Sequence, residues 1–298
     1  MGRLNVRRWV AASAFVGASV WAAQSQAFTS LFECVRQDAS LASSLPDSEA
    51  RATLEEGILL GTGTERLRKL PDGNLRIDRT RHYTRIRHPE TRRVVDLPQP
   101  WSATSVMIVR PSLRMVSCDT RFNFRREADD ILGDYKLSEH HSWMFESDRS
   151  LVRVSQDGRK LIQQAYLEGK QVKTERYDYP PHAMPIEILG LFLAVAVERR
   201  VDQFDFELIT PGGDTHGVRA QVHRTRDLRR YAQGYRVPSQ RLIAQETLAL
   251  IDMRLASPVK YLFFPHHFYL AFSEREPWKL MMMWGGDPDK NLQAFRIN

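Results

Sequence analysis

The stretch that decides the fold runs from Tyr179 to Gly213 and reads YPPHAMPIEILGLFLAVAVERRVDQFDFELITPGG. Prolines open it, and from Ile186 to Val197 Glu187 is the single charged residue. This apolar run predicts a helix over 186–200 that is apolar nearly all round, and such a helix is buried rather than half solvated. Alternating residues at 204–209 then predict a strand. The rest of the fold has to supply a surface that encloses this helix.

The flanking sequence is dominated by strand and turn patterns with a period of two. Turn signals recur at Pro71-Asp-Gly-Asn, Asp157-Gly158, Glu168-Gly169 and Pro211-Gly-Gly-Asp. Strands are predicted at 58–70, 75–88, 92–96, 105–110, 113–124, 134–146, 151–154, 160–166, 204–209, 217–223, 241–252, 259–264, 268–273, 278–283 and 292–297. We therefore expect a mainly β (α+β) fold, in which a large curved antiparallel sheet forms a half-barrel around the apolar helix.

The N-terminus has the pattern of an export signal. Arg3, Arg7 and Arg8 precede an uncharged run, and Ser25-Gln26-Ala27 predicts cleavage after Ala27. An uncleaved anchor is the alternative, although the run is short for a membrane span. No lipobox precedes Cys34. The expected location is the periplasm.

Three segments are expected: a signal peptide at 1–27, an N-terminal helical arm at 28–56 and a single antiparallel half-barrel domain at 57–298. Phe28, Leu31, Phe32 and Val35 share a helical face, and Asp47 or Ser48 would cap a second short helix. No repeat or low-complexity linker divides the chain.

Composition bounds the class of protein. The chain has 298 residues, of which 42% are hydrophobic and 27% charged, as in a globular protein with a sizeable core. Removal of the predicted signal leaves 40 basic side chains against 36 acidic ones. This surplus is too small to indicate nucleic acid as a partner.

Two cysteines, Cys34 and Cys118, are present. In an oxidising compartment the pair favours a disulfide that ties the helical arm to the sheet; two buried thiols are the alternative.

This order of elements resembles the bacterial lipoprotein-carrier half-barrel superfamily, and in particular its uncharacterised periplasmic relatives. The resemblance covers roughly residues 55–298 and lies in the twisted sheet and the Pro-flanked apolar helix. It implies a hydrophobic cavity closed by helices that often holds a lipid, and it implies no catalytic residues.

The candidate ligand contacts are apolar. Aromatic and methionine side chains together make an adaptable wall, although an ordinary core between sheet and helix is the alternative. The predicted contacts are Ile186, Leu189, Phe192, Leu193, Phe264, Phe268, Tyr269, Met281, Met283 and Trp284.

Basic residues repeat along the predicted hairpin at 76–93: Arg76, Arg79, Arg81, Arg85, Arg87, Arg92 and Arg93. They indicate either an electropositive ribbon that meets an anionic membrane surface or a solvated strand face. An envelope protein is a further candidate partner.

No catalytic or cofactor motif stands out, so no catalytic residue, metal site or cofactor is predicted. His140-His141 and His266-His267 are adjacent and point to opposite faces of a strand. Asp287 and Asp289 lie in one turn and supply too few oxygen ligands for calcium. The leading hypothesis is a non-enzymatic periplasmic protein that binds a lipid or other hydrophobic ligand. The alternatives are a structural or interaction module with a filled core and, less favoured, a hydrolase.

Overall fold

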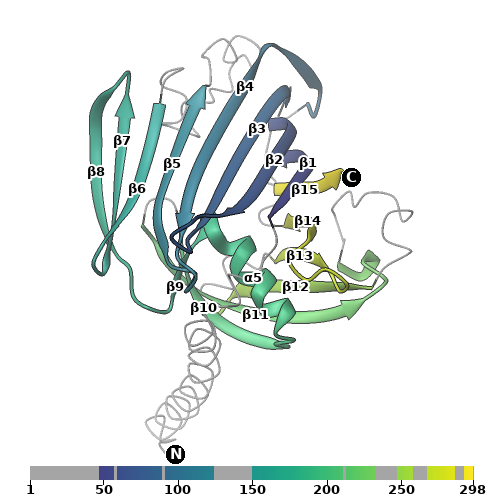
Figure 1. The fold of residues 1–298 in the computed structure, drawn as a ribbon. Coiled ribbons are helices and arrows are strands. Elements are labelled where there is room, and N and C mark those ends of the chain that lie inside the picture. The colour runs from purple at the N-terminus through teal and green to yellow at the C-terminus, as the bar shows by residue number, and fades with distance from the viewer. Residues whose placement is uncertain are drawn as a thin grey trace, which may run out of the picture.

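One curved sheet contains the strands of the described residues and wraps around a helix (Figure 1). The computed structural model describes residues 47–56, 59–88, 91–123, 150–210, 213–231, 247–257, 267–285 and 292–297. The predicted signal peptide at 1–27, Cys34, Phe264 and the predicted strands at 134–146 and 259–264 lie outside these residues. The half-barrel prediction is confirmed.

The strands of the first half are β1 (Ser48–Glu56), β2 (Leu59–Lys69), β3 (Leu75–Arg87), β4 (Val94–Val109), β5 (Met115–Asn123), β6 (Ser150–Asp157), β7 (Lys160–Leu167) and β8 (Lys170–Asp178). Those of the second half are β9 (Ala183–Pro185), β10 (Gln203–Ile209), β11 (Thr215–Thr225), β12 (Leu248–Leu255), β13 (Phe268–Ser273), β14 (Leu280–Gly285) and β15 (Leu292–Ile297). Between the halves lie the 3₁₀ turn η2 (Ile186–Ile188) and the helix α5 (Leu189–Glu198), and η3 (Arg229–Tyr231) follows β11.

The spatial order of the strands is β8-β7-β6-β5-β4-β3-β2-β1-β15-β14-β13-β12-β11-β10-β9. The first described strand pairs with the last, Arg51 opposite Ile297 and Leu54 opposite Ala294. The seam of the barrel therefore lies between β8 and β9, in the middle of the chain. Neighbouring strands are antiparallel except β9 and β10, which are parallel.

Residues 48–56 correct the prediction of a helical arm over 28–56, because they form strand β1 and not a helix. Alanine, glutamate and leucine favour a helix locally. Here Ala50, Ala52 and Leu54 alternate with the exposed residues Glu49, Arg51 and Thr53, and β1 pairs with both β2 and β15. Pairing on both sides outweighs helix propensity.

Two further differences concern strand boundaries. Segments 92–96 and 105–110, predicted as separate strands, are parts of one long strand, β4. A register shift between Tyr83 and Arg85 allows β3 to pair with both parts of β4. The polar strand β8 was not predicted, because its exposed residues show no apolar alternation.

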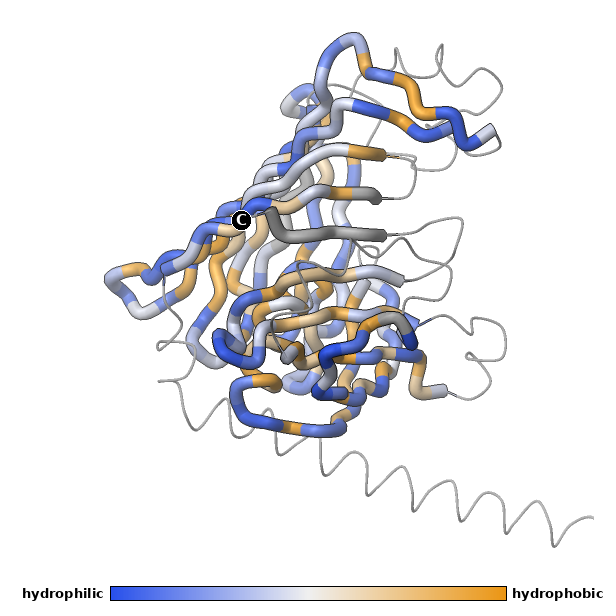
Figure 2. The backbone as a smooth tube through the Cα atoms, turned by 90° about the vertical axis from the view of Figure 1, so that its right-hand side faces the viewer, coloured by the Kyte–Doolittle hydropathy of each residue, from blue (hydrophilic) through white to orange (hydrophobic). Residues whose placement is uncertain are grey.

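The Pro71–Asn74 turn is confirmed as a hairpin. The Leu70 amide donates to the Asn74 carbonyl at 2.8 Å, and Gly73 adopts a positive φ of 82° that suits glycine. Hydrophobic and hydrophilic residues are interspersed along the strands (Figure 2), so each strand offers an apolar side to one face of the sheet.

Candidate functional site

The segment that leads into α5 is fastened to the turn between β4 and β5. The buried Tyr179 hydroxyl accepts a hydrogen bond from the Met115 amide at 3.1 Å. The Arg114 guanidinium lies 3.3 Å from the centre of the Tyr179 ring and donates to the carbonyls of Tyr179 and Pro180 at 3.0 and 2.8 Å. These contacts direct the chain into the hollow of the sheet.

Helix α5 confirms the predicted buried helix, with the ordered 3₁₀ turn η2 before it. Residues 192–197 are all buried, and Phe192 packs on Phe204 and Phe206 of β10 with ring centres 5.9 and 5.6 Å apart. The helix thus fills the lower part of the space that the curved sheet encloses, as a plug, and belongs to the main hydrophobic core (Figure 1). We call the face of the sheet that contacts α5 the concave face.

Above α5, one row of cross-strand neighbours on the concave face is polar. In strand order the row is Glu65, Arg79, Ser105 and Thr120, each opposite the next. Arg79 Nη2 lies 2.6 Å from Glu65 Oε2, and the hydroxyls of Ser105 and Thr120 are 2.9 Å apart. We call these four residues the polar row.

The polar row separates two apolar clusters. Below it, Ile77 and Met107 belong to the core around α5. Above it, Leu54, Leu59, Tyr83, Ile86, Trp101 and Ala103 form a second cluster. Charged and hydroxyl groups between apolar layers need partners, and here Arg79 pairs with Glu65 and Ser105 with Thr120. Because this row interrupts the apolar concave face, it is the first candidate for a functional site.

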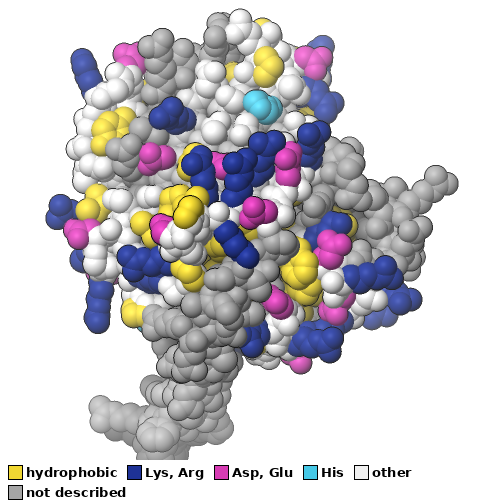
Figure 3. Space-filling view, in the orientation of Figure 1, with side chains coloured by type: hydrophobic (Ala, Val, Ile, Leu, Met, Phe, Trp, Pro, Cys, Tyr) yellow, Lys and Arg dark blue, Asp and Glu magenta, His cyan; other side chains and the backbone are white. Residues whose placement is uncertain are grey.

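The start of the helical segment approaches the polar row. Arg79 Nη2 lies 3.5 Å from the backbone carbonyl of Glu187, a long contact. The Glu187 carboxyl is desolvated, which raises its pKa, while its own backbone amide and then Arg79 and Arg81 act in the opposite direction. In Figure 3, Lys and Arg side chains gather on this face with acidic ones beside them.

Gly190 lies one turn beyond Glu187 on the same face of the helix. A Cβ atom built on Gly190 would meet no atom within 4 Å, so the space beside it is open. The neighbouring Ile186 is 39% exposed. We call the surface formed by Arg79, Arg81, Glu187 and Gly190 the bay.

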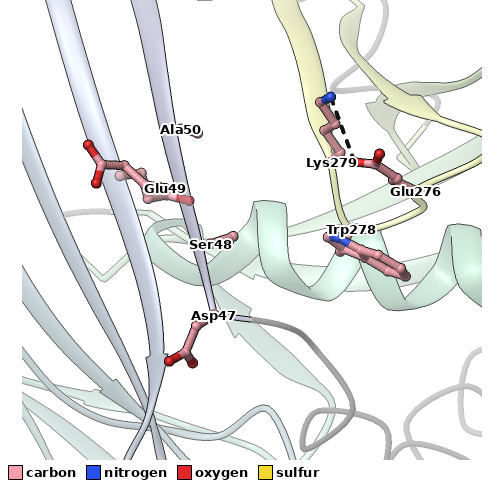
Figure 4. Close-up of a pocket in the computed structure, with 8 residues that line it drawn as sticks. Asp47, Ser48, Glu49, Ala50, Glu276, Trp278 and Lys279 are labelled. Carbon is pink, nitrogen blue, oxygen red and sulfur yellow. Dashed lines mark ion pairs between the residues drawn. The ribbon is translucent and has the colours of Figure 1, made fainter. Parts of the chain in front are cut away.

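A polar pocket of about 300 Å³ shares Glu65 with the polar row, and Figure 4 shows the other residues that line it. It forms beyond the pairing of β1 with β15, which ends at Arg51: the segment 47–50 lies on one side and Glu276, Trp278 and Lys279 on the other, with Glu65 also in the lining. Lys279 pairs with Glu276 at 3.6 Å. Glu65 therefore joins this side opening to the polar row.

The ten predicted ligand contacts do not share one surface. Leu189, Phe192 and Leu193 are buried in the helix core, where Phe268 and Met283 pack against it, and Ile186 borders the bay. Tyr269, Met281 and Trp284 belong to a separate cluster, and Phe264 lies outside the described residues. The cause is strand alternation, since Met283 and Trp284 are adjacent and point to opposite faces.

Trp284 is completely buried on the other side of the sheet. Its indole Nε1 donates to the Tyr231 carbonyl at 3.0 Å, and its ring stacks on Tyr269 at 5.3 Å. The segment with Leu228 and Tyr231 covers this side of the wall. These residues stabilise the wall and do not face α5.

The predicted basic ribbon at 76–93 divides in the same way. Arg79 and Arg81 lie on the concave face, because they alternate along β3 with the same spacing as the inward-facing Ile77 and Tyr83. Arg76 lies on the opposite parity and pairs with Asp78 at 2.7 Å. The seven arginines therefore do not form one continuous basic face.

The structure records Cys118 as a free, buried cysteine, so the predicted disulfide with Cys34 is not formed in it. Cys34 lies outside the described residues. The Cys118 side chain is directed into the core around α5, 3.7 Å from the Thr120 hydroxyl. Burial, with a smaller contribution from Glu187, raises the pKa of this thiol to about 12.

We expect Cys118 to resist alkylation in the folded protein. With a pKa of about 12 instead of 9.0, its thiolate fraction at pH 8 falls about a thousandfold, and burial slows attack further. Because the thiol ionises at a lower pH in the unfolded chain than in the folded protein, it also lowers the free energy of unfolding as pH rises from about 9 to 12. Mass-detected iodoacetamide labelling of the Cys34→Ser variant should occur only in denaturant; rapid native labelling would contradict this assignment.

Within the described ranges, no three His, Cys, Asp or Glu side chains are placed to hold a metal ion. His267 pairs through Nδ1 with Asp252 at 2.6 Å. None of the helices in the described part of the chain has the length and hydrophobicity needed to cross a membrane.

The polar row was missed from the sequence although a signal was present. Glu65, Arg79, Ser105 and Thr120 each fall at an inward position of an alternating strand. Finding the row would have required the register of four strands, which sequence alternation alone does not supply.

Comparison with known proteins adds a structural likeness. No protein-family model and no curated protein matches the chain. Among solved structures it is similar to a beta-barrel-like protein of the domain of unknown function DUF1849 from Brucella abortus, with 8% identity and a TM-score of 0.46 over 84% of this chain and 94% of that one. At such identity a likeness concerns the fold alone. The class, a mostly β protein with a barrel-like curled sheet, follows from the strand order itself.

Proposed function

We propose that this protein is a non-enzymatic periplasmic protein of the lipoprotein-carrier-like half-barrel superfamily that binds an amphipathic ligand, such as a lipid, in the bay. The observation that carries the proposal is the polar row on the concave face, between two apolar clusters and beside open space at Gly190. An amphipathic molecule needs polar and apolar surfaces side by side.

The charges of the bay favour an anionic head group. Arg79 and Arg81 offer guanidinium donors, which suit phosphate or carboxylate. Their opposing carboxylates are Glu65, which pairs with Arg79, and Glu187. Desolvation raises the pKa of the Glu187 carboxyl, and the two guanidinium groups act against that shift.

The apolar part of the ligand would lie along the exposed helix surface. Ile186 is exposed, Leu191 is half-buried, and Gly190 leaves room between them. Because α5 fills the lower hollow, the ligand would lie above the helix and not around it. This position differs from the wall predicted from the sequence.

Native mass spectrometry of residues 28–298, purified from a periplasmic fraction without detergent, tests the proposal. A stoichiometric lipid is expected. A mass without ligand, unchanged after incubation with envelope lipids, would contradict it.

Two substitutions at Gly190 sharpen the test. Gly190→Phe should fill the open space and abolish ligand retention while the fold persists. Gly190→Ala, the matched control, should retain the ligand and raise the free energy of unfolding by about 0.5–1 kcal/mol, because Ala is the better helix former and meets no neighbour. Equal ligand retention by the two variants would place any ligand outside the bay.

A second candidate is a structural or interaction module of the envelope with a filled core. The observation in its favour is the plug itself, since Phe192 to Val197 are buried against the sheet. The same mass measurement separates the two functions, because a persistently ligand-free protein favours the module.

A further inference from the structure

The two edges of the sheet differ in length and protection. At one edge, β9 has three residues and ends in Pro185, a short edge of the kind that resists further pairing. At the other edge, β8 has nine residues without proline or glycine. Among the described residues, β8 has one strand partner, β7.

Strand β8 is also the most exposed strand for which side chains are described. Seven of its nine residues are exposed, and Val172 is 59% exposed. A long edge strand presents backbone donors and acceptors to any matching strand. Its lysines, Lys170 and Lys173, discourage unselective pairing, so a partner has to match their charge.

The charge order of β8 is complementary to itself. If two copies pair antiparallel about Thr174, Lys173 of each lies opposite Glu175 of the other, and Lys170 lies opposite Asp178. The inner pair occurs twice by symmetry. A register centred on Glu175 would place Lys173 opposite Tyr177. A register centred on Arg176 would place Glu175 opposite Tyr177. The register centred on Thr174 therefore matches opposite charges best.

We propose that β8 pairs with β8 of a second copy to form a two-fold symmetric dimer centred on Thr174. In a continuous antiparallel sheet the two-fold axis stands perpendicular to the sheet, so opposed residues share a face. The contact is isologous and closes after two copies, because the other edge is short and carries Pro185.

Local geometry supports the central pairs most strongly. A register shift between Ala165 and Tyr166 affects the Lys170 end of β8, and Asp178 already contacts Lys160. Within one copy, Lys173 and Glu175 form an ion pair at 2.7 Å. When two copies meet, each of these side chains pairs with its opposite number in the second copy instead. A single strand pair is smaller than a standard interface of roughly 1,600 Å², so the dimer is weak and concentration-dependent.

The dimer would place both concave faces on the same side of one continuous sheet. Tyr177 at the lower end of β8 packs against Gly213 in the turn after β10. This contact anchors β8 to the other half of the barrel. The pairing thus presents two similarly directed hollows to a common surface.

Sedimentation equilibrium of the mature protein, residues 28–298, tests the proposal with charge-swap variants. The wild type should dimerise in the micromolar range. Lys173→Glu places like charges opposite each other twice and should weaken dimerisation roughly tenfold or more. Glu175→Lys should do the same.

Two matched controls make the test specific for the register. The double variant Lys173→Glu/Glu175→Lys should dimerise like the wild type, because the opposed charges are complementary again. A mixture of the two single variants should form a heterodimer, although each alone stays monomeric. Circular dichroism verifies that every variant is folded.

Three outcomes would overturn the proposal: a wild type that stays monomeric at its highest soluble concentration, single variants that dimerise as well as the wild type, or a double variant that remains monomeric. A Thr174→Pro variant adds an independent check, since loss of the central amide should abolish the dimer.

Discussion

Replacing Phe192 by alanine is expected to lower the free energy of unfolding by about 3–5 kcal/mol. Phe192 is 1% exposed and packs on Phe204 and Phe206 beneath α5. Removing its ring leaves a cavity among residues that the sheet holds in place, so the loss includes both the transfer and the cavity terms. Urea unfolding followed by circular dichroism measures the change.

Leu191→Ala is the matched control, because Leu191 precedes Phe192 on the same helix but is half-buried. We expect it to cost at most about half as much, since less apolar surface returns to water. Equal losses at the two positions would mean that α5 is not the plug of the half-barrel.

Replacing Gly213 by alanine is expected to destabilise the protein by about 3 kcal/mol or more. Gly213 has a φ of +84°, and a Cβ atom there would overlap the ring of Tyr177 on β8. The substitution thus combines backbone strain with a clash across the seam between the two halves of the sheet. Thermal and urea unfolding measure the loss.

Gly169→Ala separates these two causes. Gly169 has a similar φ of +79°, but a Cβ atom there meets nothing within 4 Å. It should cost about 1 kcal/mol from strain alone. In a Tyr177→Ala background, the excess cost of Gly213→Ala should disappear. If the two glycine variants lose the same stability in the wild-type background, the seam contact is not tight.

The bay depends on features that act at different levels. The open space at Gly190 is a property of one residue on a helix, whereas the polar row needs four strands in register. Substitutions at Gly190 therefore test the space without changing the charges. Charge swaps on β8 test the sheet edge and leave the bay unchanged.

Several elements could be predicted from local sequence. The buried helix follows from the uncharged run that begins at Ile188, and the hairpin at Pro71–Asn74 follows from its turn residues. Most strands follow from alternation. These features depend on neighbouring residues, so a local pattern is sufficient to predict them.

Other elements could not be predicted because distant partners decide them. Residues 48–56 have helix-forming composition but pair with β2, the next strand, and with β15 at the far end of the chain. The exposed strand β8 carries no apolar alternation and is held by β7. Local propensity is worth less than a full ladder of hydrogen bonds and cross-strand contacts.

The candidate site divides along the same line. The sequence by itself determined that an apolar helix had to be enclosed by a mostly β sheet, since burying that run is strongly favourable. Only the tertiary structure decided that Met283 faces the helix while Trp284 faces away, and that Arg79, Ser105 and Thr120 form one row. The physical reason is register: a shift of one residue moves every side chain of a strand to the other face.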